Sequence, residues 1–345
     1  MKKLNILVAT LLSVLLFSTA NAGELTVTGS VKASITTAGS DSTAGGSTTG
    51  DAQALAISND IDFAAAGELD NGITWAWKTQ LDGGVIDDSQ LTFTSSYGTV
   101  GLFVTEGGLN FKHGGSQMAL GYGSQIGSSA GFTDPDDIAS FNNIQYHTPA
   151  GLLPYGLSVK VGMTLGKGVD TESPDDSTLG IATTEHNGRT AAIEAEPLAG
   201  LKVGASYFTV DQQNKLNEAG QQEEQGAYYV SYKIGQVGLG YSKALVAPAN
   251  QKGSAATFLY NEYENTSYSI GLAVNDNLSV SYGYEKSHAN LVTNAAESDV
   301  KIDTIQAAYT MGGLTATFGV KDIENASHTA NADQSEAHLV LSMAF

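Results

Sequence analysis

The chain ends with the stretch Ala337-His338-Leu339-Val340-Leu341-Ser342-Met343-Ala344-Phe345, and this stretch decides the fold. Leu339, Leu341, Met343 and Phe345 fall at every second position, so they share one face of an extended strand. Chain ends normally fray, so a terminal strand with an aromatic last residue is predicted to be paired on both sides. The same alternation recurs along most of the chain between glycine-marked turns, which is the sequence pattern of a closed transmembrane β-barrel.

The amino-terminus is typical of an exported protein. Lys2 and Lys3 precede an apolar stretch over residues 4–17, and Ala20-Asn21-Ala22 presents small residues where a signal peptidase cleaves. We therefore predict a signal peptide over residues 1–22 and one mature domain over residues 23–345. A membrane anchor is the alternative, but the apolar stretch is short for a spanning helix and polar residues follow it soon.

The composition narrows the class of protein. The chain has 16 Lys and Arg against 36 Asp and Glu, and its formal net charge of −20 becomes −22 when Lys2 and Lys3 leave with the signal peptide. Such acidity argues against nucleic acid as a partner. The chain has no cysteine, so it offers neither a disulfide framework nor a thiolate metal site. No later segment approaches the ~20 consecutive apolar residues of a membrane helix.

Turn signals divide the mature chain into about sixteen strands. Seven short connections are expected at Asp70-Asn71-Gly72, Tyr97-Gly98, 149–156, 197–200, Gly235-Gln236, Asn275-Asp276-Asn277 and Gly312-Gly313. Eight long polar stretches alternate with them, at 38–50, 82–89, 106–140, 167–186, 211–225, 246–265, 287–300 and 323–333. This order predicts an all-β, antiparallel transmembrane barrel with both termini on the short-turn side. A soluble β-sandwich or propeller is the alternative, but neither requires every second connection to be short.

Charged residues within the predicted strands test the barrel independently. A lysine facing lipid at the bilayer centre costs ~2–4 kcal/mol, so strand lysines are expected to face a polar lumen. Asp60 and Asp62 share the lumenal face of one strand, and the register places Lys78 diagonal to Asp62, which predicts an ion pair. The strand lysines that fall on the polar face are Lys32, Lys78, Lys160, Lys202, Lys233 and Lys321. The predicted pore wall contains Lys32, Asp60, Asp62, Lys78, Lys160 and Lys202.

Three basic residues break this alternation. Arg189, Lys243 and Lys286 fall on the apolar face, but all three lie at long-loop ends of strands, where a long side chain can reach lipid headgroups. Several tyrosines and both tryptophans also project to the apolar face, as the aromatic girdles of a membrane protein do.

The ordered series of short blocks resembles the Gram-negative general-diffusion porins, particularly the alphaproteobacterial type. The resemblance covers essentially the whole mature chain. It rests on the segments 25–31, Gly67-Glu68-Leu69-Asp70-Asn71-Gly72, Ser96-Tyr97-Gly98-Thr99-Val100, Asn143-Ile144-Gln145-Tyr146-His147-Thr148-Pro149 and the terminal Phe345.

This resemblance implies a homotrimer in the outer membrane of a Gram-negative bacterium, in contact with its lipid and lipopolysaccharide. It implies a water-filled channel for passive diffusion of ions and small hydrophilic solutes. The third long loop is implied to fold into the barrel as a constriction, with acidic loop residues facing basic wall residues. The terminal Phe345 is implied to be the signal that the barrel-assembly machinery reads.

The longest loop, over residues 106–140, is the expected constriction. It carries Lys112 and His113 early and Asp134, Asp136 and Asp137 late. Acidic groups in a narrow lumen favour cations, so weak cation selectivity is expected. The alternative is a solvated surface loop in which Asp134-Pro135-Asp136-Asp137 is turn chemistry. The wall of this chain differs from that of the porins it resembles. Arginines are the usual basic wall residues of those porins, whereas this chain has only Arg189 in the barrel.

Other classes of function are less well supported. An outer-membrane enzyme needs a serine, a histidine or paired carboxylates held together, but the six histidines are scattered and none has a nucleophile-elbow pattern. A non-conducting adhesin or receptor barrel needs bulky lumenal residues, whereas Gly, Ser, Thr and Ala predominate here. A solute-specific channel is the main alternative. No cofactor is expected; Asp87-Asp88 and Asp175-Asp176 offer oxygen ligands for Ca²⁺, without a complete coordination pattern.

Overall fold

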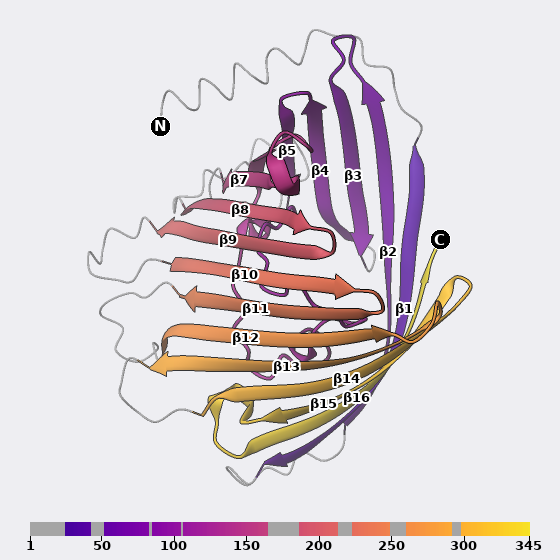
Figure 1. The fold of residues 1–345 in the computed structure, drawn as a ribbon, viewed down its shortest axis with the longest axis vertical. Helices are drawn as coiled ribbons and strands as arrows, with labels where there is room; N and C mark the ends of the chain where they lie inside the picture. Colours follow the sequence, from indigo (N-terminus) through magenta and orange to yellow (C-terminus); the bar gives the residue numbers. More distant parts are fainter. Residues whose placement is uncertain are drawn as a thin grey trace.

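The computed structural model describes residues 25–42, 52–82, 85–104, 106–164, 186–212, 223–248, 260–291 and 298–345. These residues form a closed antiparallel barrel of sixteen strands (Figure 1). The strands are β1 (Thr26–Ser42), β2 (Ala52–Glu68), β3 (Thr74–Asp82), β4 (Val85–Ser95), β5 (Gly98–Val104), β6 (Asn143–His147), β7 (Ser158–Thr164), β8 (His186–Leu198), β9 (Leu201–Gln212), β10 (Glu223–Ile234), β11 (Val237–Ala247), β12 (Tyr260–Ala273), β13 (Leu278–Leu291), β14 (Val300–Met311), β15 (Leu314–Glu324) and β16 (Ala332–Ala344). Short 3-10 turns are η2 (Gly123–Gln125), η3 (Ile138–Ser140), η4 (Pro154–Gly156) and η5 (Ala326–His328).

The terminal strand closes the barrel, as its sequence predicts. Leu339 of β16 pairs with Phe318 of β15 on one side and with Ile35 of β1 on the other. In Figure 1, β8–β13 run across the view while β2–β4 run nearly upright, because barrel strands are tilted and opposite walls therefore cross. Closure leaves no free edge at the chain end, so the predicted all-β barrel is confirmed.

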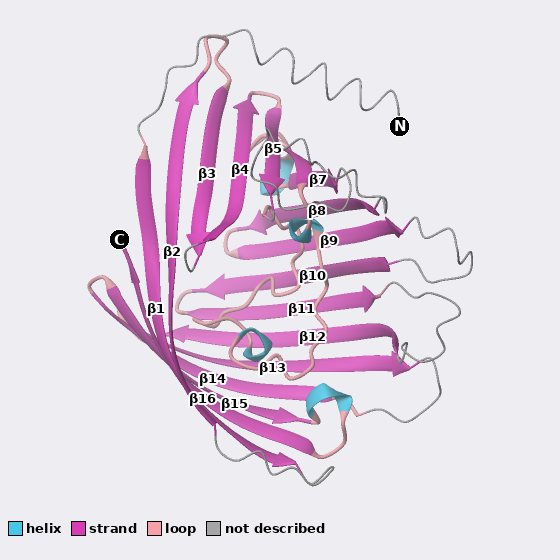
Figure 2. Ribbon diagram, turned by 180° about the vertical axis from the view of Figure 1, so that it is seen from behind, coloured by secondary structure: helices cyan, strands magenta, loops and turns pink. Residues whose placement is uncertain are grey.

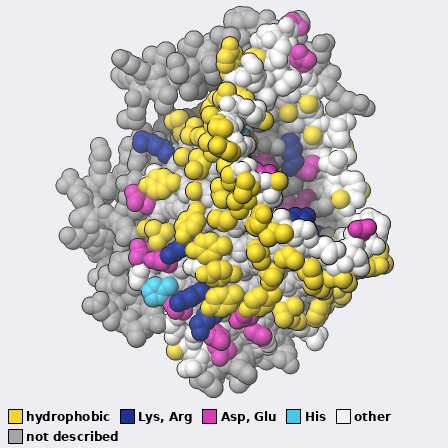
Figure 3. Space-filling model, viewed as in Figure 1, with side chains coloured by type: hydrophobic (Ala, Val, Ile, Leu, Met, Phe, Trp, Pro, Cys, Tyr) yellow, Lys and Arg dark blue, Asp and Glu magenta, His cyan; other side chains and the backbone are white. Residues whose placement is uncertain are grey.

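Side chains alternate between the two faces of the wall. In β14, Ile302, Thr304 and Gln306 face inward and are at most 2% exposed, whereas Ile305 faces outward and is 58% exposed. The outward rings of Tyr228, Tyr241, Tyr268 and Tyr284 form a row across β10–β13, with neighbouring centroids 5.2–6.4 Å apart. Figure 3 shows hydrophobic side chains gathered in a band over this face, with charged side chains along the side of the long loops. This face of the outer surface is therefore apolar at its centre and charged along the long-loop rim.

The outward basic residues lie at this rim, as predicted. Lys243 pairs with Glu264 at 2.8 Å, and Lys286 pairs with Asp299 at 2.6 Å. His288 also contacts Asp299 at 2.6 Å. These two outward lysines thus lie toward the long-loop ends of β11 and β13, where their side chains reach water or headgroups.

The short and long connections alternate as expected, with two differences in detail. Gly72 has the predicted left-handed backbone, with φ of 78°. The turn expected at Tyr97-Gly98 lies one residue earlier, and Gly98 begins β5. The long loop predicted over residues 82–89 is wrong, because β4 already begins at Val85. Its polar residues belong to a strand near the rim, where both faces of the wall meet water and a strand needs no apolar side.

The wall is lowest where the third long loop leaves it. β5, β6 and β7 have only 7, 5 and 7 residues, whereas β1 and β2 have 17 each. The loop connects β5 to β6 and therefore starts and ends at the short part of the wall. Within the described residues no helix is long and apolar enough to cross a membrane. The predicted signal peptide over residues 1–22 lies outside the described residues.

Candidate functional site

The third long loop lies inside the barrel, against the inner face of β8–β16. Figure 2 shows it crossing the inner side of these strands with its short 3-10 turns. Its backbone donates to wall side chains in succession: Phe111 to Ser206 Oγ (3.2 Å), Gln117 to Ser269 Oγ (3.1 Å) and Leu120 to Gln306 Oε1 (2.8 Å). These hydrogen bonds join the loop to β9, β12 and β14 in turn. The prediction that the loop folds inward is therefore confirmed, and the alternative of a solvated surface loop is wrong.

Glycines in the wall allow this close approach. A Cβ atom on Gly271 would lie 2.6 Å from the carbonyl oxygen of Gln117, and one on Gly240 would overlap the carbonyl of Gly115. Met118 packs over Gly283 in the same way. Small residues on the inward positions of β11–β13 therefore let the loop backbone lie flat on the sheet.

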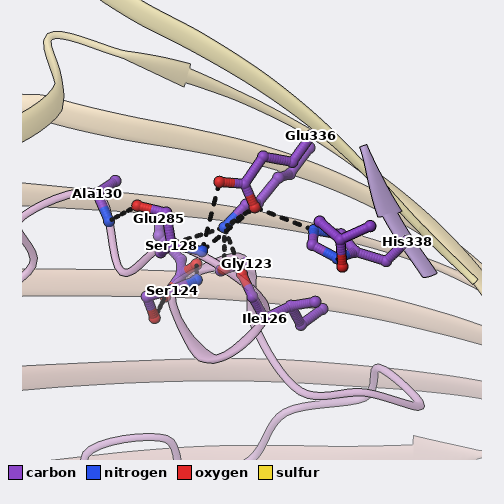
Figure 4. Close-up of polar contacts among 10 residues, drawn as sticks. Gly123, Ser124, Ile126, Ser128, Ala130, Glu285, Glu336 and His338 are labelled. Atoms are coloured by element: carbon purple, nitrogen blue, oxygen red, sulfur yellow. Dashed lines mark hydrogen bonds and ion pairs between the residues drawn. The ribbon is translucent and has the colours of Figure 1, made fainter. Parts of the chain in front are cut away.

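A buried lysine holds the tip of the loop (Figure 4). Lys321 is 2% exposed and donates to the carbonyl oxygens of Gly123 (3.2 Å), Ser128 (2.6 Å) and Ile126. Its ammonium also pairs with Glu336 at 3.1 Å. The loop residues curve around this single cation, which satisfies backbone carbonyls that would otherwise be buried without donors.

Two further wall residues extend this cluster. His338 Nε2 lies 3.1 Å from Glu336, and its Nδ1 lies 3.0 Å from the Thr36 hydroxyl on β1. Glu285 of β13 accepts hydrogen bonds from the Ser124 backbone N–H (2.8 Å) and hydroxyl (2.6 Å), both seen in Figure 4. The tip of the loop is thus fixed to three strands, β13, β15 and β16, and His338 links the cluster to β1.

The tip of the loop also contains a buried tyrosine. Tyr122 is 0% exposed, and its hydroxyl lies 3.3 Å from the Ser269 hydroxyl. Burial raises the pKa of Tyr122, so this phenol stays protonated and keeps its hydrogen bond. The contact holds the loop against β12.

The predicted acidic loop residues mainly tie the loop to itself. Asp137 accepts from the backbone N–H groups of Asn110 and Ala139, each at 2.6 Å. Asp134 contacts His113 Nε2 at 3.1 Å. Asp136 has an exposed side chain, and its backbone N–H donates to Gln225. Lys112 is half-buried, and its backbone N–H donates to Asn110. The five predicted loop residues therefore lie near one another, at the two legs of the loop rather than at its tip.

The loop covers one side of the inner wall and leaves the other open. On β1–β4 the inward residues, including Lys32, Ser58 and Gln90, are half-buried or exposed. The inward residues of β8–β16 that lie under the loop are 0–7% exposed; they include Ala192, Phe208, Tyr229, Ser242, Glu285, Thr304, Gln306, Lys321, Glu336 and His338. The open space of the barrel therefore lies between the loop and the inner face of β1–β4.

The predicted wall charges on β1–β3 face this open space. Lys78 pairs with Asp62 at 3.2 Å, which confirms the predicted diagonal ion pair. Gln80 donates to Asp62 at 3.0 Å, and Ser30 donates to Asp60 at 3.1 Å. Lys32 is exposed on β1. Lys160 of β7 is half-buried and Lys202 of β9 is exposed near the short-turn ends of their strands.

Glu106, at the start of the loop, joins the Asp62–Lys78 pair. Its carboxylate lies 3.8 Å from the Lys78 ammonium. Burial raises the pKa of Glu106, Lys78 opposes this shift, and Asp88 and Asp62 add to it. Neither this contact nor the Lys321 cluster was predictable from the alternation of the strands. The inward position of Lys321 was visible in the alternation, but its carbonyl partners lie almost two hundred residues earlier in the chain.

Metal binding has no support among the described residues. None of their histidine, aspartate and glutamate side chains form a group of three or more able to hold a metal ion. Asp175 and Asp176 lie outside the described residues. The prediction of Ca²⁺ binding at acidic loops stays untested.

Solved structures share this fold. No protein-family model and no curated protein sequence matches the chain. OmpF of Salmonella typhi in complex with daunomycin superposes with a TM-score of 0.66 at 15% identity over 94% of this chain and 98% of that chain. The channel DcaP of Acinetobacter baumannii superposes with a TM-score of 0.64 at 14% identity, over 94% of this chain and 98% of that chain. The anion-selective porin of Comamonas acidovorans superposes with a TM-score of 0.62 at 11% identity, over 94% of this chain and 100% of that chain. The chain thus has the porin barrel fold, while the alphaproteobacterial type stays a prediction.

Proposed function

We propose that the protein is an outer-membrane channel for passive diffusion of ions and small hydrophilic solutes. The observation that carries this proposal is the inward loop, which covers the inner face of β8–β16 and leaves the polar inner face of β1–β4 open. A plugged barrel would bury both walls. The likeness of fold to solved porins supports the same function.

Planar-bilayer recording of the purified protein tests the proposal directly. Stepwise conductance is the expected result. A protein that folds, judged by a heat-modifiable band on a gel, but passes no current would favour the non-conducting adhesin or receptor. Current that one sugar or amino acid blocks at low concentration, while others do not, would favour the solute-specific channel.

We also infer weak cation selectivity. The predicted mature chain carries a formal charge of −22, so both mouths of a lumen through it attract cations. The expected readout is a reversal potential of the cation-selective sign across a salt gradient. A reversal potential of the opposite sign would contradict this part of the proposal.

The proposed assembly is a homotrimer in the outer membrane, inserted by the barrel-assembly machinery. A solved structure of Vibrio cholerae OmpT, at 11% identity, is described as a trimer form. The tyrosines that face outward on strands β9–β14 suit the lipid interface, whereas residues 1–96 and 310–345 contain no tyrosine and have Trp75 and Trp77 of β3 as their interfacial aromatic residues. We therefore place the contact between copies on the arc from β16 to β4. Lipopolysaccharide is the proposed neighbour of the charged rim near Lys243 and Lys286. Conductance steps in groups of three are the expected sign of trimers.

A further inference from the structure

The surface of the loop that faces the open space carries little charge. Its exposed side chains near the tip and middle are small or neutral: Ala119, Gln125, Ser128 and Ser129. Asp134 pairs with His113, and Asp137 accepts hydrogen bonds from backbone N–H groups of the loop. Asp136 lies beside Gln225 at the long-loop end of β10. Apart from Lys112, Asp134 and Asp136 in its two legs, the loop therefore offers permeating ions mainly neutral groups.

The opposite side of the passage carries a compact set of charges. Lys78 lies 3.2 Å from Asp62 and 3.8 Å from Glu106, and the three side chains are 25–30% exposed. Water and ions therefore reach them from the lumen. The Oε2 atom of Glu106 is itself buried and has no hydrogen-bond partner among the described residues. With both carboxylates ionised, the three side chains have one negative charge in excess.

We propose that Asp62, Lys78 and Glu106 form the charge filter of the channel, in place of the aspartates of the loop. This assignment rests on the proposed channel function and names the residues that set its selectivity. Near 1 M salt the Debye length is about 3 Å, so only charges that permeating ions approach closely stay effective. Asp62, Lys78 and Glu106 meet this condition on the open wall and carry a net charge. Among the loop aspartates, Asp134 is equally exposed but is paired with His113, and Asp136 lies beside Gln225 at the long-loop end of β10.

Protonation of Glu106 then gives the filter a pH dependence. The charged groups around this carboxyl are Lys78 on β3, Asp62 on β2 and Asp88 on β4. Once Glu106 is neutral, Asp62 and Lys78 balance, and the excess of negative charge among these four groups falls from two to the one of Asp88. Because burial raises the pKa of Glu106, this loss occurs at a higher pH than for an ordinary glutamate.

Reversal potentials of the full-length protein in a bilayer, across a gradient near 1 M salt, test the assignment. Glu106→Gln and Asp62→Asn should each lower the cation preference, and Lys78→Gln should raise it. Glu106→Gln should also remove the change of reversal potential that the wild-type protein shows on mild acidification. Asp322→Asn, which removes an exposed carboxylate from the outer face of β15, is the matched control and should leave the potential unchanged.

The competing variant is Asp136→Asn. If it shifts the reversal potential while Glu106→Gln and Asp62→Asn leave it unchanged, the filter lies on the loop and the proposal is wrong. The proposal is equally wrong if none of these variants shifts the potential. Absence of current from folded wild-type protein would instead overturn the channel function itself. Heat-modifiable mobility of every variant distinguishes an altered filter from a misfolded barrel.

Discussion

Phe345 and Gly29 exchange two backbone hydrogen bonds, each 2.9 Å long, at the seam between the last strand and the first. The Phe345 ring lies directly over Gly29, so a Cβ atom on that glycine would be 2.6 Å from the ring. The last residue of the chain therefore takes part in barrel closure, and the residue opposite it has no side chain because the ring occupies that space.

Gly29→Ala should destabilise the barrel by about 1–3 kcal/mol, because the new methyl group meets both the Phe345 ring and the Asp60 carbonyl oxygen. Thermal unfolding followed by loss of heat-modifiable mobility measures the change. Gly313→Ala is the matched control, since nothing lies within 4 Å of a Cβ atom there. Equal melting temperatures for the two variants would contradict the role of the seam.

Deletion of Phe345 should slow insertion of the barrel more than it weakens the folded protein. The finished barrel loses only two backbone hydrogen bonds, each with a net value of about 0.5–1.5 kcal/mol. The assembly machinery, in contrast, loses the residue that the resemblance identifies as its signal. Pulse-labelling of folded protein in cells measures insertion. Normal insertion together with a lowered melting temperature would show that Phe345 is purely structural.

Lys321→Met should release the tip of the third loop. The change removes the donor to three loop carbonyls and leaves Glu336 buried without its cation, which costs about 3–5 kcal/mol. We expect faster proteolysis within residues 119–131 and noisier single-channel current. Lys202→Met, at an exposed inward lysine, controls for loss of a lumenal charge. Unchanged proteolysis would show that Lys321 does not hold the loop.

Asp299 should make the long-loop rim sensitive to acid. Burial raises the pKa of its carboxyl, but hydrogen bonds from Lys286 and His288 outweigh burial and hold the pKa below its ordinary value of 3.8. A carboxyl with a lower pKa in the folded state stabilises that state above the unfolded pKa, and this contribution disappears as pH falls through the folded pKa. Asp299→Asn should therefore lower the melting temperature at neutral pH and flatten its decline in acid. A parallel decline in both proteins would contradict this linkage.

The strand pattern was predictable from the sequence because lipid and water impose it locally. Ile305 and Thr304 differ in burial because successive residues of a strand face opposite sides, and a membrane tolerates only apolar residues on one of them. The same constraint predicted the inward lysines and the Asp62–Lys78 pair, since a register follows from the short turn between two strands. The prediction from this constraint failed at residues 82–89. Near the rim neither face of a strand must be apolar, so a strand there lacks the alternation.

The sequence by itself therefore determined the barrel, its sidedness and the face on which the strand lysines lie, because alternation acts between neighbours in the chain. Only the tertiary structure decided how the third loop crosses the lumen. Its position depends on Lys321, Glu285 and the wall glycines meeting a segment of chain that is more than a hundred residues away. Such contacts leave no periodic trace in the sequence. They nevertheless decide which wall stays open and which charges a permeating ion meets.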